Sequence, residues 1–361
     1  MKPIRELVQP HLRELQPYTP GQQPSGDGWI KLNTNELPCE PPRVVRDAIA
    51  AATAGLARYP DPKSGELRRA LARLNGLGEE RVLIGNGSDD ILNLLARAFG
   101  GRGRVTVDTF PSYSLYPVVT AVAGGRVESV CFTRDFTLPV KEICSMEADL
   151  LFLTCPNAPT GIRFPVDELR AVAAGTPGIL VIDEAYVEFA QSSALPLLEE
   201  FDHLVLTRTF SKAFGLAGLR VGYAMASPMI IEVLDRIRDS YNVSRLSQAG
   251  ALAALQAREF YADRIREVIA TREWVASALR RLDWEVLPSE ANFLFASPRD
   301  AKGNRGAETA KNLYETLLQR KILVRYFPSH PLTASHLRIS IGSRLEMERF
   351  IQEAEKWQKG E

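Results

Sequence analysis

Five short apolar runs in this 361-residue chain are each followed by residues that could do chemistry. These residues comprise a glycine turn, an aromatic ring, an amide, a carboxylate and a lysine. In chain order they are Gly87 with Ser88, Tyr113, Asn157, Asp183 and Lys212. In open α/β sheets, ligands bind outside the carboxyl ends of the strands. If the five runs are strands of one sheet, we expect these side chains to converge on one rim.

Each group has an ordinary structural interpretation beside the chemical one. The turn at Gly87 and Ser88 could be a simple helix N-cap, but its free N–H groups and the helix dipole would also favour a phosphate. Asp183 could cap the next segment or pair with a pyridinium nitrogen. Tyr113 could be a core or interface ring, or it could stack on a ligand.

Lys212 lies in Ser211-Lys212-Ala213-Phe214-Gly215, between an apolar run and a glycine-interrupted loop. Lysines are usually solvated, but a partly desolvated lysine has a lowered pKa and is a competent amine nucleophile. Arg220 adds a planar guanidinium suited to phosphate. A nucleophilic lysine, a carboxylate for a ring nitrogen, an aromatic ring and a phosphate cradle together indicate pyridoxal 5'-phosphate.

The elements that must position these residues follow a regular rhythm. Apolar runs alternate with helical patterns, which predicts buried strands of a largely parallel sheet and an α/β layered domain. The runs are Arg81-VLIG, Arg104-VTVD, Arg126-VESVCF, Asp149-LLFLTCP, Gly178-ILVIDEAY, His203-LVLTRTF and Arg220-VGYAMA. A long helical stretch is expected at 228–282, and then a smaller α+β pattern. We predict an N-terminal arm at 1–36, a large domain at 37–240 and a small domain at 241–361.

Composition excludes several classes of protein. Lys and Arg number 44 against 44 Asp and Glu, so no overall basic field exists to attract nucleic acid or anionic lipid. No apolar run approaches the roughly 20 residues of a membrane span, and the N-terminus lacks a signal-peptide core. The four cysteines lack CxxC spacing and disulfide-scaffold density. We expect a cytoplasmic protein without a metal, a nucleic-acid partner or a membrane partner.

Four sequence motifs carry a resemblance to a known family. They are Arg58-Tyr59-Pro60-Asp61-Pro62, Gly85-NGSDDIL, Asp183-EAYVEF and Thr209-FSKAFGLAGLRVGY. The chain resembles the fold-type-I pyridoxal-phosphate-dependent aminotransferases, and most closely the histidinol-phosphate aminotransferases, over nearly its whole length. The resemblance implies an α/β fold, with a mostly parallel central sheet flanked by helices in the large domain and a smaller α+β domain.

The resemblance also implies roles around the cofactor ring. Lys212 would be the Schiff-base lysine and proton shuttle, and Asp183 would pair with the pyridine nitrogen. Asn157 and Tyr186 would hydrogen-bond the phenolic oxygen of the ring, and Tyr113 would stack on it. Lys212, Asp183 and Tyr186 are therefore the expected catalytic residues.

A second implied set of residues holds the cofactor phosphate. It comprises Gly87, Ser88, Thr209, Ser211 and Arg220 from one chain and Tyr59 from the neighbouring subunit. The expected assembly is therefore a homodimer with shared sites.

The implied reaction transfers an amino group between L-glutamate and imidazole-acetol phosphate, giving L-histidinol phosphate and 2-oxoglutarate in histidine biosynthesis. Arg338 would hold the glutamate carboxylate, and Arg325 and Tyr18 would complete a pocket for the substrate phosphate. An aromatic aminotransferase and a threonine-phosphate decarboxylase share the same scaffold and remain alternatives. A cofactor-binding transcriptional regulator would need an added DNA-binding domain, whereas the resemblance begins close to Met1.

Two segments depart from the usual family pattern. Cys155-Pro156-Asn157-Ala158 replaces a more usual Asn-Pro-Asn-Asn, with Asn157 kept. The segment 33–40, Asn-Thr-Asn-Glu-Leu-Pro-Cys-Glu, replaces a more usual Asn-Glu-Asn-Pro-Tyr-Gly pattern. We expect segment 33–40 to lie near the substrate and to affect substrate choice more than the chemistry.

Overall fold

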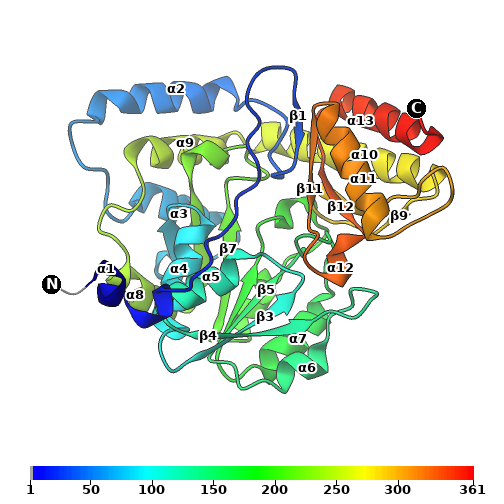
Figure 1. The fold of residues 1–361 in the computed structure, drawn as a ribbon. Coiled ribbons are helices and arrows are strands. Elements are labelled where there is room, and N and C mark those ends of the chain that lie inside the picture. The colour runs from blue at the N-terminus through cyan, green and yellow to red at the C-terminus, as the bar shows by residue number, and fades with distance from the viewer. Residues whose placement is uncertain (1–2) are drawn as a thin grey trace.

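A computed structural model describes residues 3–361, and these residues form two β-sheets (Figure 1). The larger sheet has seven strands, and the second has five. The order in the larger sheet is β2 (Val82–Gly85), β8 (Gly222–Ala226), β7 (Leu204–Thr209), β6 (Ile179–Asp183), β5 (Leu150–Thr154), β3 (Val105–Phe110) and β4 (Arg126–Cys131). All seven correspond to runs predicted as strands.

Strands β3 to β7 are mutually parallel, whereas β8 pairs antiparallel with both β7 and β2. The strands β5 and β6 are almost completely buried because helices cover both faces of the sheet. This arrangement confirms the predicted α/β fold with a mostly parallel central sheet.

Alternating residues of each central strand enter different cores, as the two-residue period of a strand requires. Phe152, Val181 and Val205 pack with α4 (Ser88–Phe99), α5 (Leu115–Ala123) and α8 (Pro228–Ile237). Leu153 and Ile182 belong to the larger core. That core also takes in residues of α2 (Arg43–Ala52), α3 (Gly65–Asn75), α6 (Val140–Cys144), α7 (Val166–Gly175) and α9 (Arg245–Gln256).

The second sheet has the order β1 (Ile30–Leu32), β11 (Ile322–Tyr326), β12 (Leu337–Ser340), β10 (Phe293–Ser297) and β9 (Glu285–Val286). Helices α11 (Ala307–Gln319), α12 (Pro331–Ala334) and α13 (Arg344–Lys359) lie in the same part of the molecule (Figure 1). Strand β1 comes from the predicted arm and pairs parallel with β11. The arm also carries the short helix α1 (Ile4–Leu7). The predicted domain boundaries stay a prediction. Helix α9 falls within the predicted small domain at 241–361, yet it packs on α2 and α3 of the predicted large domain.

The helical stretch expected at 228–282 is not continuous. It divides into α8, α9 and α10 (Arg258–Arg281). Ser244 ends the first break, because its side chain accepts a hydrogen bond from the backbone N–H of Ser247 at 3.1 Å and caps α9. No helix within residues 3–361 is long and apolar enough to cross a membrane.

Candidate active site

The carboxyl ends of β5, β6 and β7 open into a cavity of about 340 Å³. Residues from both sheets and from the arm line it. The predicted site residues in its lining are Tyr18, Ser88, Tyr113, Asp183, Tyr186, Thr209, Ser211, Lys212, Arg220, Arg325 and Arg338. The cavity therefore brings together residues that lie as far apart in sequence as the arm and β12.

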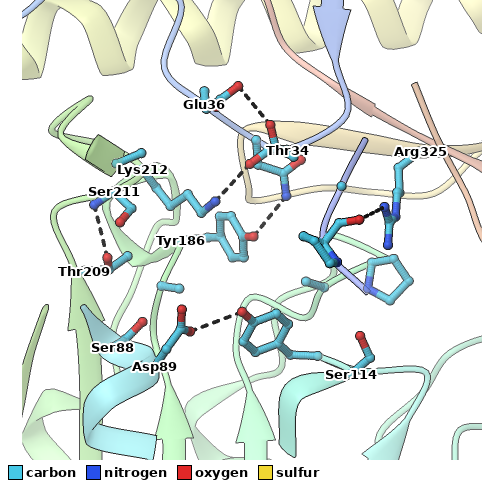
Figure 2. A pocket seen from close by; sticks show the side chains of 18 of the residues that line it. Thr34, Glu36, Ser88, Asp89, Ser114, Tyr186, Thr209, Ser211, Lys212 and Arg325 are labelled. Atoms are coloured by element: carbon cyan, nitrogen blue, oxygen red, sulfur yellow. Dashed lines mark hydrogen bonds between the residues drawn. The ribbon is translucent and has the colours of Figure 1, made fainter. Parts of the chain in front are cut away.

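Lys212 reaches the cavity from the loop after β7. Its Nζ donates a hydrogen bond to the backbone carbonyl of Thr34 at 3.0 Å, as Figure 2 shows. Burial lowers the pKa of Lys212 to about 8, and the nearby positive charge of Arg338 acts in the same direction. At neutral pH the amine therefore loses its proton far more easily than a solvated lysine does.

Asp183 ends β6 as a buried carboxylate. Each of its two oxygens accepts a hydrogen bond from a hydroxyl group: Oδ1 from Thr207 at 3.1 Å and Oδ2 from Tyr116 at 2.9 Å. Burial raises the pKa of Asp183 to about 6, and both hydrogen bonds oppose that rise. The carboxylate is thus held in one orientation and kept ionised at neutral pH. Tyr116 was not predicted, since a tyrosine in an apolar helix gives no sequence signal of a polar role.

Tyr186 follows β6 and is also buried. Its hydroxyl oxygen accepts a hydrogen bond from Nδ2 of Asn35 at 2.9 Å, drawn in Figure 2. Burial raises the pKa of Tyr186, while the charge of Arg338 and the Asn35 amide oppose the rise. Sequence analysis singled out segment 33–40 because it departs from the usual family pattern, but it predicted an effect on substrate choice and not this contact of Asn35 with Tyr186.

An anion site lies at the start of α4. Gly87 adopts φ +85°, a conformation that favours glycine, and a Cβ there would come 2.5 Å from Nη2 of Arg220. No described side chain caps the helix, so its first N–H groups are free to bind an anion. Arg220 Nη1 lies 3.4 Å from Ser211 Oγ, and Thr209 Oγ1 accepts from the Ser211 N–H at 3.1 Å.

Asp89, in the first turn of the same helix, partly neutralises this site. Its Oδ2 lies 3.0 Å from Arg220 Nη2, and its Oδ1 accepts the Tyr113 hydroxyl at 3.1 Å. The ring of Tyr113 meets those of Tyr18 and Tyr116 edge to face, at 5.8 and 5.6 Å between centroids. These contacts hold the Tyr113 ring at the wall of the cavity.

Two arginines line the side of the cavity formed by the second sheet. Arg338 donates from Nη2 to the Asn33 carbonyl at 2.8 Å, while its buried Nε has no partner within residues 3–361. Its guanidinium carbon lies 5.4 Å from the centre of the Phe293 ring. Burial lowers the pKa of Arg338. An anion in the cavity would supply a negative charge beside the Arg338 guanidinium and an acceptor for its Nε–H.

Arg325 holds the arm over the cavity. It donates to the backbone carbonyls of Thr19 and Pro20 at 3.1 and 3.2 Å. These contacts place Tyr18 in the lining.

Three predicted residues are absent from the cavity lining: Gly87, whose backbone is described above, Asn157 and Tyr59. The amide of Asn157 donates to the Pro111 carbonyl at 3.2 Å and accepts from Thr160 Oγ1 at 2.8 Å, so both ends are bonded within neighbouring loops. Tyr59 is 77% exposed, with its ring stacked on Tyr241 at 4.4 Å between centroids. Contacts of Asn157 with the ring and of Tyr59 with a second subunit stay predictions.

Comparison with known families decides the class of this site. The family described as aminotransferase class I and II matches residues 27–353. The chain belongs to this family. The predicted enzyme class is therefore confirmed, and pyridoxal 5'-phosphate is the cofactor of this aminotransferase. Three features of the cavity fit this cofactor. The buried Asp183 carboxylate fits its ring nitrogen, the desolvated Lys212 fits its carbonyl, and the uncapped N-terminus of α4 fits its phosphate.

Named relatives agree with this assignment. The aminotransferase is 44% identical to a histidinol-phosphate aminotransferase of Geotalea daltonii, over 92% of this chain and 94% of the relative. It is 41% identical to the enzyme of that name from Synechocystis, over 95% and 96% of the two chains.

Solved structures show the same fold. The histidinol-phosphate aminotransferase of Sinorhizobium meliloti, solved in complex with pyridoxal-5'-phosphate, is 28% identical with a TM-score of 0.85, covering 92% of this chain and 91% of that one. An L-threonine-O-3-phosphate decarboxylase from Porphyromonas gingivalis has a TM-score of 0.79 at 23% identity, over 91% and 98% of the chains. At that identity the likeness extends to the fold alone.

Proposed function

We propose that this aminotransferase exchanges an amino group between L-glutamate and imidazole-acetol phosphate, giving L-histidinol phosphate and 2-oxoglutarate. The observation that carries the proposal is the buried Arg338, with its unpartnered Nε, in the same cavity as Lys212 and Arg325. A transaminase must accept two substrates in one site, and a guanidinium fork suits both a carboxylate and a phosphate. The names of the relatives support the same substrate.

The geometry supports an assignment of the residues that would hold the cofactor. When bound, pyridoxal 5'-phosphate supplies an electrophilic carbonyl and a ring that accepts the electron pair released at the substrate Cα. Asp183 keeps a proton on the ring nitrogen, because its ionised carboxylate favours the protonated form. The N-terminus of α4, Ser211 and Arg220 bind the phosphate.

Lys212 has two tasks, and its lowered pKa suits both. As a neutral amine it is a nucleophile toward the carbonyl. As a free amine it would move the proton between the substrate Cα and the reacting carbon of the cofactor, because a pKa of about 8 allows it to gain and lose a proton near neutral pH.

The assembly we propose is a homodimer in the cytoplasm. Its support is the exposed Tyr59, whose stacked ring with Tyr241 leaves a large aromatic surface for a second copy. In the dimer, Tyr59 would reach the cofactor phosphate of the partner. The four free cysteines are typical of a reducing compartment.

The test is a set of half-reactions with the cofactor-loaded enzyme, followed by the change in visible absorption. Glutamate and histidinol phosphate should each convert the cofactor to its amine form. Arg338→Ala should impair both substrates, and Arg325→Ala should impair histidinol phosphate more than glutamate. A lost charge-assisted hydrogen bond costs about 1.5–3 kcal/mol, so each loss should be roughly ten- to a hundredfold in kcat/KM.

Two results would contradict the proposed substrate. If unphosphorylated aromatic amino acids react as well as histidinol phosphate, the enzyme is an aromatic aminotransferase. If threonine phosphate releases carbon dioxide faster than glutamate gives up its amino group, the enzyme is a decarboxylase.

A further inference from the structure

The residues 33–35, which follow β1, contact three different site residues in succession. The Asn33 carbonyl accepts from Arg338, the Thr34 carbonyl accepts from Lys212, and the Asn35 side chain donates to Tyr186. Each of these contacts joins residues more than 150 positions apart in sequence. This segment therefore connects the arm with both halves of the site.

The backbone of Asn35 is fixed by the second sheet. Its N–H donates to Oγ of Ser340 in β12 at 2.9 Å, and its carbonyl accepts from Nδ2 of Asn292 at 2.9 Å. Its φ is +57°, in the left-handed region, where asparagine is far better tolerated than most residues. The side chain of Asn35 thereby lies between Ser340 and Tyr186.

The hydroxyl of Ser340 determines which way round the Asn35 amide lies. Its oxygen already accepts the Asn35 N–H, so its single proton is donated to Asn35 Oδ1, 2.8 Å away. With its carbonyl end occupied in this way, the amide presents its NH₂ group to the Tyr186 hydroxyl at 2.9 Å. The direction of each hydrogen bond in the chain from Ser340 to Tyr186 is therefore defined.

These hydrogen bonds determine where the hydroxyl proton of Tyr186 can be donated. A tyrosine hydroxyl has one proton, and here its oxygen is the acceptor toward Asn35. Among residues 3–361 no group accepts that proton. The proton is free to be donated into the cavity that Tyr186 lines beside Lys212.

We propose that Asn35, oriented by Ser340, is a positioning residue that makes Tyr186 a hydrogen-bond donor to the phenolic oxygen of the cofactor ring. The proposal deepens the proposed function, because it rests on Tyr186 contacting that oxygen. A donor there stabilises the negative charge that the oxygen carries when the nitrogen linking Lys212 to the cofactor loses its proton. The hydrogen-bond chain therefore lowers the pH at which the bound cofactor changes its visible absorption.

The decisive variant is Asn35→Asp, which keeps the shape and the tolerance for a left-handed conformation but replaces the NH₂ group by an acceptor. Tyr186 must then donate to the new carboxylate and turn its proton away from the cofactor. In the loaded enzyme, the pH midpoint of the visible absorption should rise by about one unit, because a charge-assisted hydrogen bond is lost. In the cofactor-free protein, NMR of ring-labelled tyrosine should show a raised pKa for Tyr186.

The negative charge that Asn35→Asp adds is controlled by repeating the measurement in a Tyr186→Phe background. There the Asn35→Asp shift should be much smaller, because no hydroxyl is left to reorient. A shift of the same size in both backgrounds is a simple charge effect and would overturn the proposal.

Two further results distinguish the role of Asn35 from the contact of Tyr186 with the cofactor ring, on which it rests. If Tyr186→Phe alone leaves the midpoint unchanged, the ring contact of Tyr186 is wrong and the proposal fails with it. If Tyr186→Phe raises the midpoint but Asn35→Asp does not, only the role of Asn35 is wrong.

An uncharged variant guards against misfolding of Asn35→Asp. Ser340→Ala frees the amide to rotate, so the midpoint should rise by a smaller amount in the same direction. Ser297→Ala, which removes a buried serine hydroxyl at the end of β10 in the same sheet, is the matched control and should leave the midpoint unchanged. Equal midpoints for Ser340→Ala and Ser297→Ala would contradict the orientation of the amide by Ser340.

Discussion

Asp183 and Lys212 are ionisable groups whose charge is controlled by their immediate neighbours. Burial moves the pKa of each toward neutrality, upward to about 6 for Asp183 and downward to about 8 for Lys212. Between these two values the carboxylate is charged and the amine still exchanges its proton. Such a site should gain activity as pH rises through these two values, because Asp183 must be ionised to pair with the ring nitrogen and Lys212 must be a neutral amine to act as a nucleophile.

At this scale the first prediction concerns Tyr116→Phe. Removing the hydroxyl that donates to Asp183 should raise the pKa of Asp183 in the cofactor-free protein by up to about one unit, since a hydrogen bond to a charged group is lost. A neutral Asp183 cannot pair with a protonated ring nitrogen. As pH falls, cofactor affinity should therefore begin to weaken at a higher pH in the variant than in the wild type.

The measurement is the Kd of pyridoxal 5'-phosphate for the cofactor-free protein across the acidic to neutral pH range. Tyr261→Phe is the matched control, because Tyr261 is also buried but its hydroxyl has no hydrogen-bond partner within the described chain. Superimposable pH profiles for Tyr116→Phe and Tyr261→Phe would show that the Tyr116 hydroxyl does not control Asp183.

At the scale of the element, helix α4 is the anion site we propose, because its first turn has no side-chain cap and follows a glycine of positive φ. Ser211 follows β7 and Arg220 precedes the antiparallel β8, so the connection between these two strands brings both residues to the same point. Each free N–H contributes part of the binding, and the helix dipole adds to it. A side chain at position 87 would disturb both the backbone and Arg220.

We expect Gly87→Ala to weaken binding of pyridoxal 5'-phosphate by roughly tenfold or more, because the new Cβ meets Arg220 at a φ of +85°. Binding of pyridoxal, which lacks the phosphate, should change much less. Gly103→Ala is the control, since its φ is +79° but its Cβ would meet nothing within 4 Å. Calorimetric titration of both ligands checks this. Equal losses for the two ligands would assign the effect to general backbone strain.

At the scale of the whole molecule, Tyr59 is a large exposed aromatic residue that is not part of the cavity lining of its own chain. Its place is explained if it completes the site of a partner subunit. The cavity would then be built from three sources: the large sheet, the second sheet with the arm, and the second copy.

Mixed dimers test this arrangement. Tyr59→Ala and Lys212→Ala homodimers should each have little activity, whereas a heterodimer should regain activity because one of its two sites carries both wild-type residues. Differently tagged subunits, exchanged and purified as heterodimers, allow the measurement. Heterodimers as inactive as the Lys212→Ala parent would show that each site is built from one chain.

The sequence by itself determined the strands of the large sheet and the polar residues at their ends. These features are local: an apolar run, a turn residue and a lysine or carboxylate lie next to one another in the chain. Since parallel strands end at one rim, Asp183 and Lys212 could be placed together without coordinates. The division of 228–282 into three helices was missed, because a cap such as Ser244 is a weak signal inside a helical pattern.

Only the tertiary structure decided how the site residues are oriented. Asn35 and Tyr186 lie 151 residues apart, and Tyr116 and Asp183 lie 67 apart. Whether such pairs meet depends on how the second sheet and α5 pack against the large sheet, which no local pattern encodes. Asn157 follows its strand as the sequence predicted, but its amide is hydrogen-bonded to nearby loop groups, and the sequence did not indicate those partners. Hydrogen-bond direction is a property of packed neighbours, and packing is determined by the whole chain.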